Sequence, residues 1–170
     1  MSDNIILIGY RGSGKSSVAR EIARQSHRMV YSTDDLIERR FGKIENLVRE
    51  HGWAHFRALE RQLLQEFRGS HAVLDCGGGI VENDENRARL KSLGTVFWLT
   101  ADSPTIRARL SGSQNRPALT QDSSFLDEIP DILRRREPLY RALADICIDT
   151  KDKSITAVAS EVMARIEPEQ

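Results

Sequence analysis

The sequence has no excess of charge of either sign. Its 25 Lys and Arg residues equal its 25 Asp and Glu residues, so the formal net charge at pH 7 is zero. Non-specific binding to nucleic acid or to an anionic membrane surface depends on an excess of positive charge. We therefore expect no nucleic-acid partner and no membrane association. The balanced charge and the lack of a long apolar surface helix are compatible with a monomer, which is the state we expect.

Long apolar runs and cysteines are also scarce. No run approaches the ~20 apolar residues of a membrane-spanning helix, and the first residues, Met-Ser-Asp-Asn, do not resemble a signal peptide. The two cysteines, Cys76 and Cys147, are far apart, and each lies inside an apolar run. We interpret them as reduced, buried thiols of a cytosolic protein. Together these features predict a cytoplasmic protein.

Short apolar runs alternate with longer charged segments along the 170 residues, a length that suits one domain spanning residues 1–170. The runs predict strands at Ile5–Ile8, Met29–Ser32, Ala72–Cys76, Thr95–Leu99 and Ile146–Ile148. The charged segments predict helices at Lys15–Gln25, Asp34–Phe41, Ile44–Phe67 with a break near Gly52, Glu85–Ser92, from Pro104 with Ser103 as its cap, and Ser154–Ile166. This alternation predicts an α/β fold, a parallel sheet with helices on both faces.

A phosphate-binding loop follows the first predicted strand. Gly9-Tyr10-Arg11-Gly12-Ser13-Gly14-Lys15-Ser16 matches the pattern G-x-x-x-x-G-K-[ST] in full, between a strand and a helix. Such a loop points backbone N–H groups at phosphates, its lysine reaches the β- and γ-phosphates, and its serine hydroxyl ligates Mg²⁺. We expect the nucleotide to contact Gly12, Ser13, Gly14, Lys15, Ser16 and Ser17.

The loop alone predicts binding of a nucleoside triphosphate without specifying the reaction. No N/T-K-x-D guanine motif is present, and the chain is too short for a motor with accessory elements. A second set of residues is therefore needed. It consists of Ser32-Thr33-Asp34, Phe56-Arg57 with Glu60 one helical turn on, Gly77-Gly78-Gly79, Arg116-Pro117, and Arg136-Glu137-Pro138-Leu139-Tyr140.

This set, in this order and spacing, resembles shikimate kinase, and the resemblance runs from about Ile5 to Ile166. It implies the fold of nucleoside-monophosphate kinases: a five-stranded parallel sheet, a substrate-binding helical region at 33–61 and a lid. It implies transfer of the γ-phosphate of ATP to the 3-hydroxyl of shikimate, in chorismate biosynthesis. It also implies that Arg109 stacks on adenine. The polar, aperiodic segment 111–124 independently reads as a mobile lid because it is long for a loop in a compact domain.

The residue types fit a hydroxylated acid. Arginine forks hold a carboxylate best, and Arg57 and Arg136 supply two. Asp34 can accept hydrogen bonds from ring hydroxyls and polarise the attacking one. The backbone N–H groups of Gly78 and Gly79 can approach the ligand closely. Arg116, on the lid, would neutralise charge on the transferred group, so Lys15, Asp34 and Arg116 are the expected catalytic residues.

The second strand ends in Ser32, where many shikimate kinases carry an aspartate that supports Mg²⁺. Asp75 stands where the family usually has a small or uncharged residue. We hypothesise that Asp75 holds Mg²⁺ through water, as a Walker-B-type carboxylate, in company with Ser16. The alternative is that Asp75 hydrogen-bonds to loop amides.

Two other interpretations of the function remain open. The acceptor could be a gluconate-like acid, because the same arginines and aspartate would bind it. The chain could also be an inactive P-loop module with a regulatory role. In addition, we interpret Arg134 and Arg135 as an exposed helix face, and Trp53 and Trp98 as packing residues.

Overall fold

The computed structural model describes residues 3–111 and 126–166 of the chain. Its centre is a five-stranded parallel sheet in the order β2-β3-β1-β4-β5. The strands are β1 (Asn4–Ile8), β2 (Met29–Ser32), β3 (Ala72–Asp75), β4 (Gly94–Thr100) and β5 (Ile146–Asp149). The predicted five-stranded parallel sheet is therefore confirmed, with each strand within two residues of its predicted ends.

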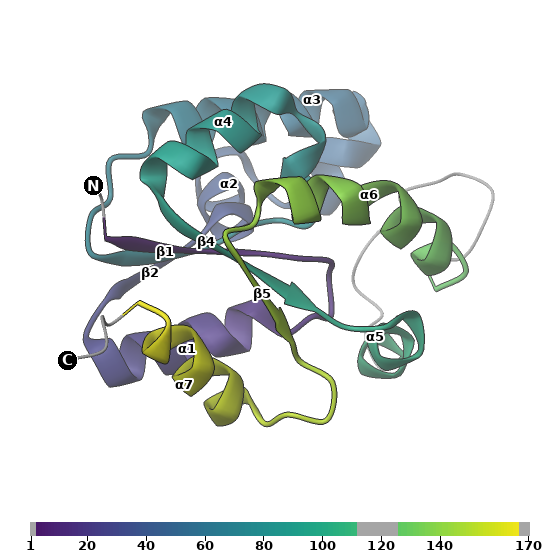
Figure 1. Cartoon of the computed structure of the whole chain (residues 1–170). Helices are drawn as coiled ribbons and strands as arrows, with labels where there is room; N and C mark the ends of the chain where they lie inside the picture. Colours follow the sequence, from purple (N-terminus) through teal and green to yellow (C-terminus); the bar gives the residue numbers. More distant parts are fainter. Residues whose placement is uncertain (1–2, 112–125, 167–170) are drawn as a thin grey trace.

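Helices cover both faces of the sheet (Figure 1). Helices α1 (Lys15–Ser26) and α7 (Ile155–Ala164) pack on one face. Helices α3 (Ile44–Glu66), α4 (Asp84–Leu93) and α6 (Ile129–Leu143) contribute to the core on the other. The remaining elements are α2 (Thr33–Phe41), α5 (Ser103–Leu110) and a short 3₁₀ helix, η1 (Ile80–Glu82). The predicted break in α3 is present, because Gly52 has a φ of 82°.

Strand β1 explains why the sheet is covered on both sides. Ile5 and Leu7 belong to the core beneath α1 and α7, whereas Ile6 and Ile8 belong to the core beneath α3, α4 and α6. All four side chains are at most 1% exposed. A run without polar alternation is typical of a central parallel strand, since both of its faces are buried.

Three local predictions are wrong. Helix α6 is absent from the predicted elements, although Arg134–Arg136 were expected to lie on a helix; Pro138 inside it obscures the pattern. Asp102, and not Ser103, caps α5, because its side chain accepts a hydrogen bond from the Thr105 amide. Cys147 is exposed, because β5 is an edge strand, while Cys76 is buried as predicted.

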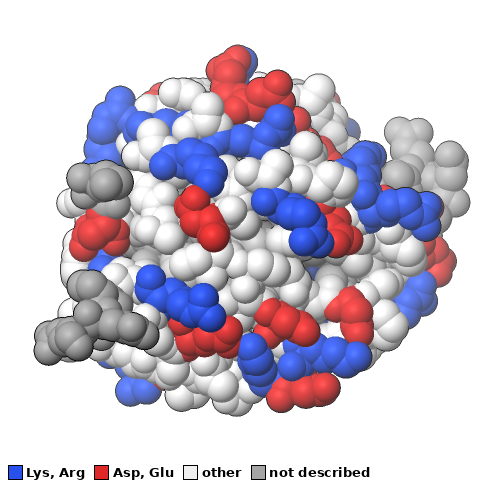
Figure 2. All heavy atoms as spheres, in the orientation of Figure 1, with Lys and Arg blue, Asp and Glu red and all other residues white. Residues whose placement is uncertain are grey.

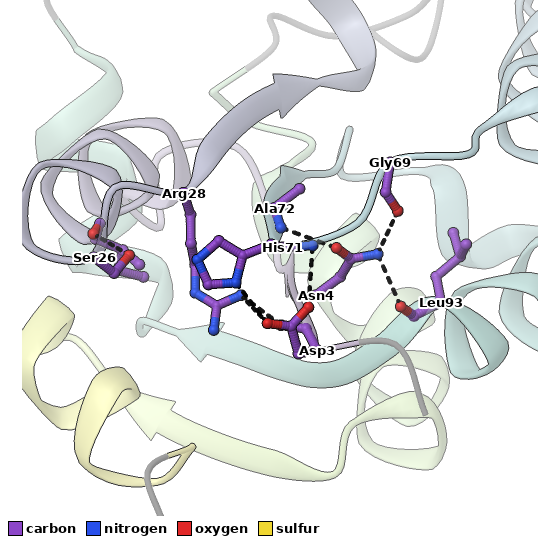
Figure 3. A network of polar contacts seen from close by, with 9 residues as sticks. Asp3, Asn4, Ser26, Arg28, Gly69, His71, Ala72 and Leu93 are labelled. Atoms are coloured by element: carbon purple, nitrogen blue, oxygen red, sulfur yellow. Dashed lines mark hydrogen bonds and ion pairs between the residues drawn. The ribbon is translucent and has the colours of Figure 1, made fainter.

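A polar network ties the strands together at their amino ends (Figure 3). The Asn4 side chain donates to the carbonyls of Gly69 and Leu93 and accepts from the amide of Ala72. Asp3 accepts from the His71 amide at 3.0 Å. These bonds join β1 to the starts of β3 and β4. They help to fix the register that brings the opposite, carboxyl ends of these strands to one edge.

The surface mixes charges of both signs. On the face drawn in Figure 2, Lys and Arg side chains are interspersed with Asp and Glu side chains, without a broad patch of one sign. This distribution agrees with the zero net charge of the whole sequence. Among the helices within the described residues, none is long and apolar enough to cross a membrane.

Candidate active site

The phosphate loop connects the end of β1 to the start of α1. Gly9 and Gly14 have φ values of 145° and 94°, which favour glycine, and a Cβ at Gly9 would lie 2.5 Å from the Leu99 carbonyl oxygen. Lys15 is 7% exposed, and its ammonium group donates to the carbonyls of Gly9 (2.8 Å) and Tyr10 (3.0 Å). The loop thus has the strand-to-helix setting that its motif requires, and its lysine folds back over it.

Ser16 and Asp75 are in direct contact beside this loop. The Ser16 hydroxyl donates to Oδ2 of Asp75 at 2.5 Å, and Asp75 is only 6% exposed. Strand pairing places Asp75 directly opposite Ser32 on β2. The Ser32 hydroxyl accepts a hydrogen bond from the Asp35 amide and so caps α2. A carboxylate is therefore available one strand away from the position where the sequence has a hydroxyl.

A pocket of about 420 Å³ lies next to the loop. It is bounded by the phosphate loop, α2, α3, α6 and the glycine turn that follows β3. Five predicted substrate-binding residues line it together: Asp34, Arg57, Gly78, Gly79 and Arg136. They come from segments up to 102 positions apart, between residues 34 and 136, so the fold alone brings them together.

Carboxylates hold the two arginines that were predicted to bind the substrate, Arg57 and Arg136. Glu60 accepts from NH1 of Arg57 at 2.5 Å, as its position one turn away predicts. Glu82 accepts from Nε of Arg136 at 2.8 Å. Arg136 is 2% exposed, whereas the side chains of Arg134 and Arg135 are 79% and 60% exposed. The interpretation of Arg134 and Arg135 as an exposed helix face is confirmed, whereas Arg136 is buried.

The glycine turn gives these side chains room. A Cβ at Gly79 would lie within 2.7 Å of three guanidinium atoms of Arg57. A Cβ at Gly77 would lie 2.7 Å from Oδ1 of Asp34 and 2.9 Å from Oε1 of Glu60. Gly78 has only ordinary contacts around such an atom, and its carbonyl accepts from the Tyr140 hydroxyl at 2.5 Å. The side chains of Asp34, Glu60 and Arg57 therefore pack directly against this turn.

Comparison with known proteins identifies the family to which the chain belongs. A family model described as "Shikimate kinase" matches residues 11–167. The chain belongs to the shikimate kinase family.

Individual relatives agree with this assignment. The chain is 39% identical to shikimate kinase of Syntrophus aciditrophicus, over 98% of this chain and 92% of the relative. It is 36% identical to shikimate kinase of Persephonella marina, over 96% and 98%. The solved structure of shikimate kinase from Acinetobacter baumannii in complex with shikimate matches with a TM-score of 0.91 and 32% identity, over 98% of this chain and 93% of that one. Proteins of the shikimate kinase family use ATP as a substrate.

Arg109 was expected to stack on adenine, and Arg116 was expected to neutralise charge on the transferred group. Arg109 donates to the Gly12 carbonyl (3.1 Å) and to the hydroxyl and carbonyl of Thr150 (3.0 and 3.1 Å). It thereby links the phosphate loop to the segment after β5. Arg116 lies outside the described residues, as does the predicted lid beyond Ser111.

Sequence reasoning missed two residues that line the pocket, Arg11 and Trp53, and a third, Glu82, that pairs with one of its arginines. Arg11 lines it from the variable part of the phosphate loop, where a basic side chain was the available signal. Trp53, interpreted as a packing residue, lines it too, with its ring 5.4 Å from the guanidinium carbon of Arg57. Glu82 was missed because its only signal is an acid three positions after the glycines.

Glu60 has a strongly perturbed acid–base equilibrium. Burial raises its pKa to about 7, although the Arg57 guanidinium partly offsets this and Asp34 adds to it. Its Oε1 and Oδ1 of Asp34 both lie within 2.9 Å of the same point above Gly77. They are therefore less than about 6 Å apart, a separation at which like charges disfavour each other. The geometry favours a proton on Glu60 at or below neutral pH.

Proposed function

We propose that the protein transfers the γ-phosphate of ATP to the 3-hydroxyl of shikimate. One observation carries the proposal: an aspartate and two carboxylate-binding arginines share a pocket that opens beside the phosphate loop. Shikimate carries one carboxylate and three hydroxyls on a ring, so it presents the groups that these side chains recognise. Membership of the shikimate kinase family supports the same acceptor.

Different pocket residues bind the acceptor carboxylate and orient the acceptor hydroxyls. Arg57 and Arg136 hold the acceptor carboxylate, because guanidinium groups pair with carboxylates through two parallel hydrogen bonds. Asp34 accepts from the ring hydroxyls and orients the attacking one towards the phosphate loop. Gly78 and Gly79 let the backbone approach the ring closely. Phosphoryl transfer depends mainly on such positioning and on charge stabilisation, so no strong base is needed.

The phosphate loop residues hold the nucleotide. Backbone amides from Gly12 to Ser17 would bind the β-phosphate. The Lys15 ammonium, which donates to two loop carbonyls in this structure, would donate to the β- and γ-phosphates instead when the nucleotide is bound. Arg109 contacts adenine. Arg116 neutralises the charge that develops on the transferred group.

Ser16 and Asp75 fit a hard divalent cation. Hydroxyl and carboxylate oxygens are the ligands that Mg²⁺ accepts, and these two are already in contact at 2.5 Å. No other candidate is evident, since the described part of the chain has no group of three or more His, Cys, Asp or Glu residues that could hold a metal. Bound Mg²⁺ would offset charge on the β- and γ-phosphates.

We further propose that the protein acts as a monomer in the cytoplasm, where ATP is available. The phosphate loop and the residues proposed to bind the acceptor all belong to the same chain, which is compatible with a monomer. Size-exclusion chromatography with light scattering tests the monomer, and a dimer mass would contradict it.

An assay of ADP release tests the function. Purified protein, ATP and Mg²⁺ are mixed with shikimate, gluconate or AMP as acceptor, and ADP is measured by a coupled reaction. We expect turnover with shikimate alone. Turnover with gluconate would identify another acid as the acceptor. ATP binding without turnover on any of the three would indicate an inactive nucleotide-binding module.

A further inference from the structure

Glu82 touches arginines from two helices without lining the pocket. Its Oε1 accepts from Nε of Arg136 and from NH2 of Arg135, both at 2.8 Å. Its Oε2 lies 3.8 Å from Nε of Arg57, an ion pair and not a hydrogen bond. One carboxylate therefore connects α3 with α6, whose contacting residues lie 79 positions apart, from 57 to 136.

The contact leaves the working end of Arg136 available to the pocket. Glu82 binds the Nε edge of this guanidinium, and NH1 lies 3.5 Å from the point that a Cβ on Gly78 would occupy. The guanidinium has a fixed fork of donors, so anchoring one edge fixes the direction of the others. Glu82 thus fixes one edge of the Arg136 guanidinium while NH1 lies near Gly78, which lines the pocket.

The backbone around Glu82 is itself held. Its amide donates to the Gly79 carbonyl at 3.1 Å, and the Ile80 amide donates to the Gly77 carbonyl at 3.2 Å. The same short segment therefore lines the pocket with its glycines and carries the Glu82 carboxylate that binds Arg136. A side chain fixed in this way loses little further freedom when it holds a partner.

The negative charge of Glu82 also balances the positive charges of the arginines around it. Burial raises the pKa of Glu82, but Arg136 and Arg135 outweigh this and hold its pKa below the ordinary value, so it stays ionised near neutral pH. The other carboxylate on these arginines, Glu60, has a pKa of about 7 and is partly protonated there. Of the two carboxylates, Glu82 is therefore the one that stays negatively charged beside Arg57 and Arg136 at neutral pH.

We propose that Glu82 is a positioning residue that sets the geometry of Arg57 and Arg136 and thereby the affinity for the acceptor carboxylate. The inference rests on the proposed function, because it concerns how the same pocket holds shikimate. It goes beyond that function in assigning part of the acceptor affinity to a residue outside the pocket lining.

Two substitutions of Glu82 separate its charge from its shape. Glu82→Gln keeps an acceptor oxygen for Arg136 but removes the charge, whereas Glu82→Ala removes both. Glu85→Gln is the matched control: Glu85 lies nearby in sequence at the start of α4, its side chain is 61% exposed, and it pairs with Arg61 outside the pocket. Steady-state kinetics give KM for shikimate, KM for ATP and kcat. Calorimetry of shikimate binding to nucleotide-free protein gives Kd without turnover.

We expect Glu82→Ala to raise shikimate KM and Kd about tenfold or more, the loss expected when a charge-assisted contact no longer fixes a binding group. Glu82→Gln should show an intermediate rise, and Glu85→Gln should match the unchanged protein. KM for ATP and the thermal midpoint should stay within error in all three variants. This split distinguishes positioning from a general structural role.

Two results would overturn the inference. The first is shikimate KM and Kd unchanged in Glu82→Ala. The second is a parallel loss of ATP affinity and thermal stability, which would make Glu82 a general structural residue. If the unchanged protein neither binds nor phosphorylates shikimate, the proposed function fails as well. If the unchanged protein phosphorylates shikimate and the Glu82 variants have the same KM and Kd for shikimate, this inference fails while the proposed function stands.

Discussion

Adding one methyl group at Gly79 should disable Arg57 while sparing the fold. A Cβ at this position would lie within 2.7 Å of three atoms of the Arg57 guanidinium, closer than any tolerated contact. The backbone of Gly79, with φ −90° and ψ 0°, is open to alanine, so the conflict is purely steric. The obstructed group is the end of a flexible side chain. We therefore expect Arg57 to move off the turn and the protein to fold normally.

The size of the loss follows from what Arg57 supplies. A hydrogen bond to a charged group contributes about 1.5–3 kcal/mol, and each 1.4 kcal/mol corresponds to a factor of ten in affinity. Displacing one of two arginine forks from the acceptor carboxylate should therefore raise shikimate Kd roughly ten- to a hundredfold. ADP affinity should not change, because the conflict involves none of the phosphate-loop residues.

Calorimetry of shikimate and ADP binding to Gly79→Ala measures both affinities, and a double-mutant cycle identifies the cause. If the methyl group acts through Arg57, adding it to Arg57→Ala should cost little more, since the two sites are strongly coupled. Gly78→Ala should cost less, because a Cβ there meets only contacts of 3.4 Å or longer. Normal shikimate affinity in Gly79→Ala, or full additivity with Arg57→Ala, would refute the reasoning.

The remaining predictions concern Glu60, Asp75 and Arg109. Burial raises the pKa of Glu60 from its ordinary 4.5 to about 7, so the folded state binds the proton more tightly and stability falls as pH rises from about 4.5 to 7, by up to roughly 3 kcal/mol. Urea unfolding should show Glu60→Gln gaining stability relative to the unchanged protein between pH 5 and pH 8; a difference that is constant with pH would contradict this. Asp75→Asn should raise the Mg²⁺ concentration for half-maximal rate, and should weaken Mg²⁺-dependent ADP binding by several-fold, because it removes the carboxylate on Ser16; an unchanged Mg²⁺ titration would show that Asp75 serves the loop alone. Arg109→Ala should weaken ADP binding with shikimate Kd unaffected, since Arg109 contacts the phosphate loop and Thr150 and does not line the acceptor pocket; equal effects on both ligands would argue against an adenine role.

Features set by neighbouring residues could be predicted from the sequence. The phosphate loop is a contiguous motif, and the ion pair of Arg57 with Glu60 follows from a spacing of three residues on a helix. The five strands were predicted because each is a short apolar run between longer charged segments. The shared pocket of Asp34 and Arg136 followed from the family resemblance, not from local pattern.

Features set by the packing of distant segments could not be predicted. The contact between Glu82 and Arg136 joins residues 54 positions apart, and no local period signals it. Cys147 lies in an apolar run like Cys76, yet only strand order puts it on an edge strand. Trp53 is apolar enough for a core, and its place on the pocket wall depends on the bend at Gly52.

A crystal structure with ADP, Mg²⁺ and shikimate tests the central claim most directly. The claim is that the pocket beside the phosphate loop holds the acceptor by its carboxylate and presents a ring hydroxyl for phosphorylation. We predict the carboxylate within hydrogen-bond distance of Arg57 and Arg136, and the 3-hydroxyl between Asp34 and the terminal phosphate of ADP. Shikimate bound with its carboxylate away from both arginines, or with its 3-hydroxyl facing away from the nucleotide, would contradict the account.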